Sequence, residues 1–398
     1  MNLKLRSKND WGRLDMTSEW HEAPLRELVG YISKGIAPSY AEEASETTIR
    51  VLNQKCNRNF RISYGDSRLH DTLKKKVPPE RYVKPDDILI NSTGAGTAGR
   101  IAQIEDVPSA TTIDGHMILI RSNGKVTQKF LGYALKAHQW EVLQLDEGST
   151  GQTELNRDRL LDEIMINYPV SFDEQNAIVG TLESIDRKLI VNEQLNDNLL
   201  EQASSIYQAW FEDFILSDGS CPPSWKQGTL AGIADITSGK RPPVKSAEKT
   251  DNAIIPIVGA ASVMGYTTEA NHTDKILVTG RVGTHGVVQR FNSPCWASDN
   301  TLVITSAFYE YTFQILQRID YRTLNRGSTQ PLITQGDMNK VPILIPDNET
   351  LLKFETLVGQ LMKQYQVNLL ENDKLAELRD ALLPKLMSGE IDVSAVHF

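Results

Sequence analysis

The chain has 398 residues, a formal net charge of −9 and a hydrophobic fraction of 40%. This length predicts two or three domains. No apolar run approaches the roughly 18–20 residues of a membrane-spanning helix, and the polar N-terminus MNLKLRSKND lacks the apolar core of a signal peptide. We therefore expect a cytoplasmic protein with no membrane partner, in which the widely spaced Cys56, Cys221 and Cys295 are reduced thiols rather than a disulfide or zinc framework.

Negative charge is concentrated in two segments of the chain. Residues 171–218 contain ten Asp or Glu and two Lys or Arg, and residues 347–398 contain nine and five. Residues 1–170 are balanced in charge and residues 219–346 are slightly basic. Because phosphates repel an acidic surface, a nucleic acid would contact the balanced and basic segments.

Residues 1–19 are expected to form an irregular leader, and a module begins at Trp20. Residues 86–99 read DDILINSTGAGTAG, a short strand that runs into a glycine-rich turn, and residues 100–104 supply the returning strand of a hairpin. The module continues with a strand at 117–120, helical pieces within 127–144, the polar turn GSTGQTELN at 148–156 and a strand at 164–169.

A long helix is predicted over residues 172–214, which contain no Pro and one Gly. Its apolar residues alternate at spacings of three and four, as in a helix that packs along a partner helix, and it would be roughly 60 Å long. Residues 354–387 repeat the pattern at a shift of 176, with Asn368 aligned on Asn192 and Asn372 on Asn196. Because a seam Asn fixes register, we expect the two helices to pair.

Some apolar residues of the first helix exceed what one two-helix seam can bury, which predicts a partner protein on it. They are Leu195, Leu200, Tyr207, Phe211 and Phe214.

A second module repeats the first, and Trp225 follows Trp20 by 205 residues. Residues 274–286, DKILVTGRVGTHG, match the first strand and glycine-rich turn, and the later elements follow in the same order. They are strands at 287–291, 301–304 and 341–346, a helical piece at 307–320 and the polar turn GSTQPLIT at 327–334. The predicted order is a module (1–170), a helix (171–217), a module (218–346), and a helix with the C-terminal tail (347–398).

Two motifs invite catalytic interpretations that their surroundings do not favour. Residues 94–99 match GxGxxG, but a dinucleotide site needs a helix to begin at the last Gly, and residues 100–104 are typical of a strand. Asp86 and Asp87 beside Lys84 lack the further carboxylates of a metal-dependent nuclease, so a turn at the strand entry is favoured. With neither an Asn-Pro-Pro-Tyr methylase signature nor a P-loop, we expect a non-catalytic chain with no cofactor and no metal.

Side chains that donate to phosphates and pair with base edges gather in the glycine-rich and polar turns and where each module's first strand region ends. The candidate DNA-binding residues of the first module are Lys34, Thr93, Thr97, Arg100, Thr150, Gln152, Asn156 and Arg157. Those of the second module are Lys240, Arg241, Arg281, Thr284, His285, Arg326, Thr329 and Gln330.

This arrangement resembles the specificity (S) subunit of type I restriction-modification systems over nearly the whole chain. The resemblance is carried by KPDDILI (84–90) with its glycine-rich turn, by GSTGQTELN leading to DEQNAI (173–178), and most specifically by LRDALLPKLMSGEI (378–391). The second module departs from the pattern, since its hairpin lacks the paired aspartates and its helix begins with DNETLL.

The resemblance implies an α+β fold in the wider α/β class, with two similar globular target recognition domains, two long antiparallel coiled-coil helices and a pseudo-twofold internal repeat. Each domain would read one half of a split site in double-stranded DNA, and the helices would set the spacer. Two methyltransferase (M) subunits would dock and methylate adenine at N6, and motor-endonuclease (R) subunits would join for restriction of phage DNA. The alternatives are a recognition subunit for a fused methylase-nuclease and a scaffold that binds no DNA.

Overall fold

The computed structural model describes residues 4–5, 19–94, 96–147, 154–324 and 332–393. The chain divides into two compact units, residues 1–190 with 372–398 and residues 191–371, which we call the first and the second unit. The long helices α4 (Phe172–Tyr207) and α8 (Asn348–Met387) each contribute one part to each unit. Within the described residues, no helix is long and apolar enough to cross a membrane.

The first unit contains two four-stranded sheets, one of strand order β10-β9-β12-β3 and one of order β11-β5-β8-β4. The first sheet is antiparallel, whereas β11 runs parallel to β5 in the second. The strands of the first sheet are β3 (Val29–Lys34), β9 (Ile88–Asn91), β10 (Ile101–Gln103) and β12 (Met117–Ser122). Those of the second are β4 (Tyr40–Ala41), β5 (Thr48–Leu52), β8 (Arg68–Asp71) and β11 (Thr111–Ile113).

Strands β9 and β12 are apolar on both faces, and both faces are buried. Ile88, Ile90 and Ile118 point into the core beneath the helices, whereas Leu89 and Leu119 point into a second core between the sheets. This alternation follows from the two-residue period of a strand, and a continuous apolar run is typical of a strand covered on both sides. The covering helices are α1 (Gln128–Ala137), α2 (Gln139–Val142) and α3 (Arg157–Glu163).

The second unit repeats this architecture, which confirms the predicted internal repeat. Its antiparallel sheet has the order β17-β23-β20-β21, and its second sheet, β19-β18-β22, again contains one parallel pair, β18 with β22. The strands are β17 (Asp235–Ser238), β18 (Ile255–Val258), β19 (Val263–Thr267), β20 (Ile276–Gly280), β21 (Val288–Phe291), β22 (Trp296–Ala297) and β23 (Thr301–Thr305). The helices are α5 (Tyr309–Arg318), α6 (Tyr321–Leu324) and α7 (Gln335–Asn339).

A two-stranded antiparallel ribbon joins the start of each module to its end. In the first unit β2 (Trp20–Pro24) pairs with β15 (Met165–Pro169), and in the second β16 (Lys226–Thr229) pairs with β24 (Pro342–Ile345). The remaining two-stranded pairs are β6 (Asn57–Arg58) with β7 (Arg61–Ile62), β13 (Asp146–Glu147) with β14 (Glu154–Leu155), and β1 (Lys4–Leu5) with β25 (Ile391–Asp392). The leader expected to be irregular therefore contains one short strand.

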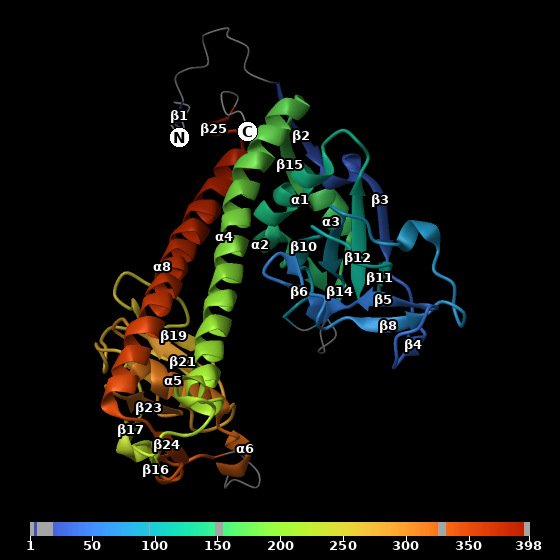
Figure 1. Cartoon of the computed structure of the whole chain (residues 1–398). Coiled ribbons are helices and arrows are strands. Elements are labelled where there is room, and N and C mark those ends of the chain that lie inside the picture. The colour runs from blue at the N-terminus through green and yellow to red at the C-terminus, as the bar shows by residue number, and fades with distance from the viewer. Residues whose placement is uncertain (1–3, 6–18, 95, 148–153, 325–331, 394–398) are drawn as a thin grey trace. The chain divides into compact units, whose positions relative to one another are not determined.

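Helices α4 and α8 pair antiparallel, because partner positions rise along one helix as they fall along the other (Figure 1). In the first unit Asp186 contacts Arg379, and Leu189 O accepts a hydrogen bond from Asn372. In the second unit Asn192 donates to Glu371 at 2.8 Å, and Asn368 donates to Asn196 at 2.9 Å. Of the seam asparagines expected from the sequence, Asn192, Asn196 and Asn368 are buried between the two helices, and Asn372 is half-buried.

The first long helix is shorter than predicted, and most of the apolar residues expected to bind a partner protein are covered within the second unit. Helix α4 ends at Tyr207 and continues as a single π-helical turn, Gln208–Glu212, short of the predicted end at 214, whereas α8 begins at Asn348, six residues before the segment 354–387 that repeats the first helix's pattern. Tyr207 and Phe211, counted as surplus apolar residues, are buried in the core of the second unit. Leu200 and Phe214 pack against that same core, and only Leu195 of the five is exposed.

Candidate nucleic-acid interface

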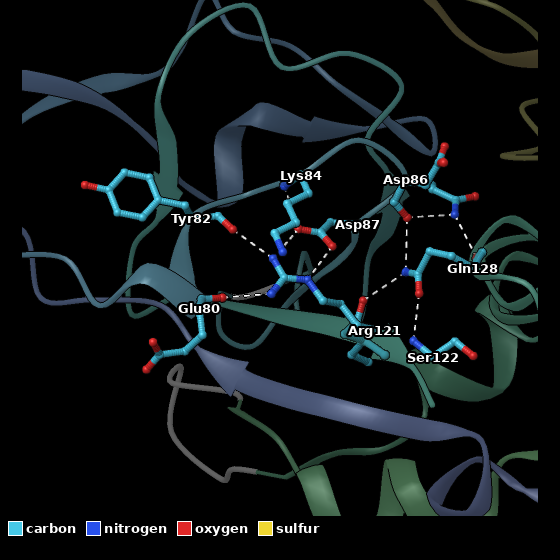
Figure 2. A network of polar contacts seen from close by, with 10 residues as sticks. Glu80, Tyr82, Lys84, Asp86, Asp87, Arg121, Ser122 and Gln128 are labelled. Carbon is cyan, nitrogen blue, oxygen red and sulfur yellow. Dashed lines mark hydrogen bonds and ion pairs between the residues drawn. The ribbon is translucent and has the colours of Figure 1, made fainter. Parts of the chain in front are cut away.

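The paired aspartates at the start of β9 have structural contacts. Both carboxylate oxygens of Asp87 accept from the Arg121 guanidinium at 2.7 Å, and Oδ2 also accepts from Lys84 N at 2.7 Å (Figure 2). Asp86 adopts a positive φ of 67° at the turn. The strand-entry turn favoured from the sequence is confirmed, and within the described ranges no group of three or more His, Cys, Asp or Glu is placed to hold a metal ion.

The glycine-rich motif at 94–99 forms the turn of a hairpin. Gly94, Gly96 and Gly99 all have positive φ, at 114°, 68° and 83°, a conformation that glycine adopts without strain. Strand β10 follows at Ile101 and pairs antiparallel with β9. Because a strand rather than a helix follows the last Gly, the motif lacks the helix N-terminus that holds a pyrophosphate.

In the first unit, four separate segments meet at one end of the antiparallel sheet and form the first loop cluster, which comprises Lys34, Thr93, His116 and Glu154. Lys34 forms an ion pair with Glu154, and Thr93 Oγ1 lies 2.8 Å from His116 Nδ1. Thr93 also forms a β-bridge with Glu154. The end of β3, the glycine-rich turn, the loop before β12 and the end of the polar turn are therefore adjacent.

The second unit brings the equivalent segments together in the same way, and they form the second loop cluster, which comprises Ser238, Arg281, Asn300 and Gln335. Arg281 N donates to Asn300 O at 2.8 Å and Gln335 Nε2 donates to Ser238 Oγ at 3.0 Å. Ile333 N donates to Arg281 O at 3.0 Å. The matching backbone bonds in the first unit run from Ser92 N to His116 O and from Leu155 N to Ser92 O, both at 2.8 Å.

A glycine at the end of β3 and another at the end of β17 allow this convergence. A Cβ on Gly35 would lie 2.1 Å from Asp114 O, and a Cβ on Gly239 would lie 2.1 Å from Ser298 O. Neither position has room for a side chain, because the backbone of the loop before β12 passes directly over Gly35, and that of the loop before β23 passes directly over Gly239. The module pattern Ser-x-Gly and Ser-Gly at these places thus has a shared steric cause.

Most of the described candidate residues lie at these two ends of the sheets. Lys34 and Thr93 belong to the first loop cluster, and Arg281 belongs to the second. Arg100 is exposed, and its guanidinium donates to Gly96 O at 3.0 Å. Lys240, Arg241 and Thr284 are exposed, whereas His285 is half-buried with Nδ1 3.1 Å from Gly280 O.

Two candidates are held by local backbone contacts. Thr97 Oγ1 donates to Gly94 O at 3.3 Å within its own turn. Asn156 is the N-cap of α3 and its side chain accepts from Asp158 N and Arg159 N at 3.0 and 3.1 Å, a role typical of asparagine. Arg157 follows it and is exposed. The candidates Thr150, Gln152, Arg326, Thr329 and Gln330 lie outside the described residues.

Sequence reasoning missed five members of the loop clusters, His116 and Glu154 in the first and Ser238, Asn300 and Gln335 in the second. Glu154 ends the polar turn, and His116 and Asn300 occupy equivalent, exposed positions just before β12 and β23. Burial raises the pKa of Asp114, whose Oδ1 accepts from His116 N at 2.9 Å and so holds this loop. An alignment of the two modules on the strands at 117 and 301 would have paired His116 with Asn300.

Comparison with known proteins agrees with this geometry. A family model described as the type I restriction modification DNA specificity domain matches residues 17–201 and 222–379. The type I restriction enzyme MjaIX specificity subunit of Methanocaldococcus jannaschii is 27% identical, with 98% of each chain covered. The HindI specificity subunit of Haemophilus influenzae is 19% identical, with 94% of this chain and 100% of that protein covered.

Among solved structures, the S subunit of a type I restriction-modification system from M. genitalium has a similar fold. The TM-score is 0.56 at 17% identity, with 94% of this chain and 98% of that chain covered. The two family matches coincide with the two repeated modules and their helices, and together they include most of the chain. This chain therefore belongs to the type I restriction-modification DNA specificity family.

Proposed function

We propose that this chain is the sequence-reading subunit of a type I restriction-modification complex, in which each module reads one half of a split double-stranded DNA site. The observation that carries the proposal is the repeated convergence of four segments into a loop cluster in each unit. Each cluster combines donors and acceptors of the kind that contact phosphates and base edges. Two equivalent readers in one chain are suited to a two-part target.

The chain itself would supply recognition, and its partners would supply chemistry. Methyltransferase subunits would bring S-adenosylmethionine, flip an adenine out of the duplex and methylate N6, and motor-endonuclease subunits would join for restriction. Exposed apolar residues along the helices, including Leu195, Leu352 and Leu357, would lie under docked partner subunits. Helices α4 and α8 would set the distance between the half-sites.

Methylome sequencing tests the proposal. A host that expresses this chain with its methyltransferase subunits should acquire methylated adenines in a split motif with one fixed spacer, and a host that lacks this chain should not. A continuous motif, or no methylation that depends on this chain, would contradict it. Copurification distinguishes the alternative of one fused methylase-nuclease partner, and selection from random-sequence duplexes tests the scaffold without a DNA role.

A further inference from the structure

A buried ionic cluster joins the first module to both long helices. Its centre is the Asp186 carboxylate on α4, and we call it the Asp186 cluster, which comprises Tyr133, Lys136, Asp186 and Arg379. Tyr133 Oη donates to Oδ2 at 2.9 Å and Lys136 Nζ donates to the same oxygen at 3.1 Å. Arg379 on α8 donates to Oδ1 at 3.2 Å.

The Asp186 cluster is shielded from solvent, and two cations share one carboxylate. The side chains of Lys136, Asp186 and Arg379 are 11%, 17% and 17% exposed. Burial acts to raise the pKa of Asp186, but Lys136, Tyr133 and Arg379 outweigh it and hold the pKa below its usual value. Charge-assisted hydrogen bonds of this kind are directional and roughly twice as strong as neutral ones. The cluster therefore holds α1 at one position along α4.

Contacts continue from the Asp186 cluster to the glycine-rich turn of the first loop cluster. The Lys136 ammonium lies 5.0 Å from the Phe60 ring centroid, and Phe60 forms a β-bridge with Ala102 in β10. Two residues after α1 ends, Gln139 accepts from Ile101 N at 2.9 Å and donates to Gly99 O at 2.8 Å. Helix α1 is thus bonded to the long helices on one side and to the recognition turn on the other.

A cavity of about 290 Å³ adjoins the Asp186 cluster and is lined by Phe60, Lys136 and Asp186 among other residues. Space beside the cluster means that close packing does not hold α1 in place here as it does in a dense core. The direction of the ionic hydrogen bonds decides the position of the module at this point. In the second unit the buried Met362 occupies the position that a shift of 176 assigns to Asp186. The ion pair that joins α5 to the turn after α4 there, Arg318 with Glu212 at 2.9 Å, is more exposed, at 27% and 46%.

We propose that Asp186 is a positioning residue that fixes the first module's recognition turn relative to α4 and α8, and thereby restricts the complex to one DNA spacer length. The inference rests on the proposed function. Asp186 acts through Lys136, Tyr133 and Arg379, and not by contacting DNA. Loosening the Asp186 cluster should leave both half-site sequences unchanged and widen the range of spacers that the complex accepts.

The test uses the double variant Asp186→Asn with Lys136→Met in the full complex, because it removes the central ion pair without leaving Lys136 as a buried unpaired charge. Methylome sequencing should show the same two half-motifs as the wild type. Methylation at spacers one base pair longer or shorter should rise about tenfold, the change expected from losing one charge-assisted hydrogen bond. Unchanged spacer selectivity would overturn the inference.

Two control variants separate positioning from general loss of stability. Val83→Ala weakens the core between the sheets of the first unit and should lower the melting temperature without changing the spacer preference. Asp380→Asn removes the exposed partner of Arg379 and should also leave the spacer preference unchanged. If Val83→Ala widened the range of accepted spacers as much as the double variant does, Asp186 would have only a structural role. Absence of a split motif in the wild type would instead contradict the proposed function.

Discussion

The two modules share a topology but are attached to the long helices by different chemistry. In the first unit α1 is bound through ion pairs, Lys129 with Glu183 at 2.6 Å and Lys136 with Asp186 at 3.1 Å. In the second unit α5 is bound mainly through packed rings, with Tyr311 4.7 Å from Phe211 between ring centroids, and its one ion pair to this region, Arg318 with Glu212, is partly exposed within the described residues. Ionic contacts are directional and weaken with salt, whereas aromatic packing depends mainly on buried area.

The N-termini of α1 and α5 are also bonded to the long helices by different chemical groups. Gln175 on α4 accepts from Thr127 N at 2.8 Å next to α1, whereas Glu355 on α8 accepts from Glu310 N and Tyr311 N at 3.1 and 2.8 Å in α5. The first contact is neutral at every pH, and the second titrates. A repeated fold therefore constrains where a module meets its helices, but leaves open which side chains make the contact.

The largest expected effect comes from breaking the aromatic attachment. Phe211 is 4% exposed and packs against Tyr311, Phe354 and Trp225, so Phe211→Ala should lower the free energy of unfolding by about 3–5 kcal/mol. Denaturant unfolding followed by tryptophan fluorescence measures it. Trp140→Ala, at a side chain that is 74% exposed, is the control. A loss for Phe211→Ala no larger than that of the control would show that the packing of Phe211 does not hold the second module to its helices.

Breaking the ionic attachment should cost somewhat less. Asp186→Asn leaves Lys136 and Arg379 without their shared carboxylate, and we expect a loss of about 3 kcal/mol, as for a broken buried pair. Adding Lys136→Met should recover part of this loss, because the buried ammonium is removed. A thermodynamic cycle of the two single variants and the double variant measures the coupling. Strictly additive losses would show that the two side chains do not interact.

The pH dependence of the second attachment is the third prediction. Burial raises the pKa of Glu355 from 4.5 to about 7, so the folded state favours the protonated acid. The contribution is fully present below pH 4.5 and is lost as pH rises through about 7, with a change of about 3 kcal/mol. Unfolding of the wild type and Glu355→Gln from pH 4 to 8 measures it. The variant should lack this component, and identical pH profiles would contradict the prediction.

The smallest effect concerns the first loop cluster and rests on the proposed function. Lys34 and Glu154 form an exposed ion pair, which contributes little to stability, and Glu154 would repel a phosphate that Lys34 binds. Glu154→Gln should therefore tighten DNA binding by the complex about threefold to tenfold at low salt and leave the melting temperature unchanged. Glu377→Gln, an equal charge change on α8, should alter affinity less. Equal gains would indicate a general charge effect.

The repeat, the hairpins and the helix pair could be predicted from the sequence because their signals are local or periodic. The strand at Ile88–Asn91 and the glycine-rich turn are read from neighbouring residues, and the seam of α4 follows the helical period. The loop clusters could be predicted only in part. Lys34 and Thr93 were identified one by one, but their contacts with Glu154 and His116 join segments that are far apart in the chain.

The sequence by itself determined that this chain contains the same module twice, each followed by a long amphipathic helix, because strand alternation, glycine turns and heptad spacing are encoded within short segments. Only the tertiary structure decided how each module is attached. Tyr207 and Phe211 have the spacing of a partner surface yet are buried in their own unit, and Asp186 resembles any acidic residue of a solvated helix until Lys136 and Arg379 are placed beside it. Burial and ion pairing depend on neighbours that folding alone brings together.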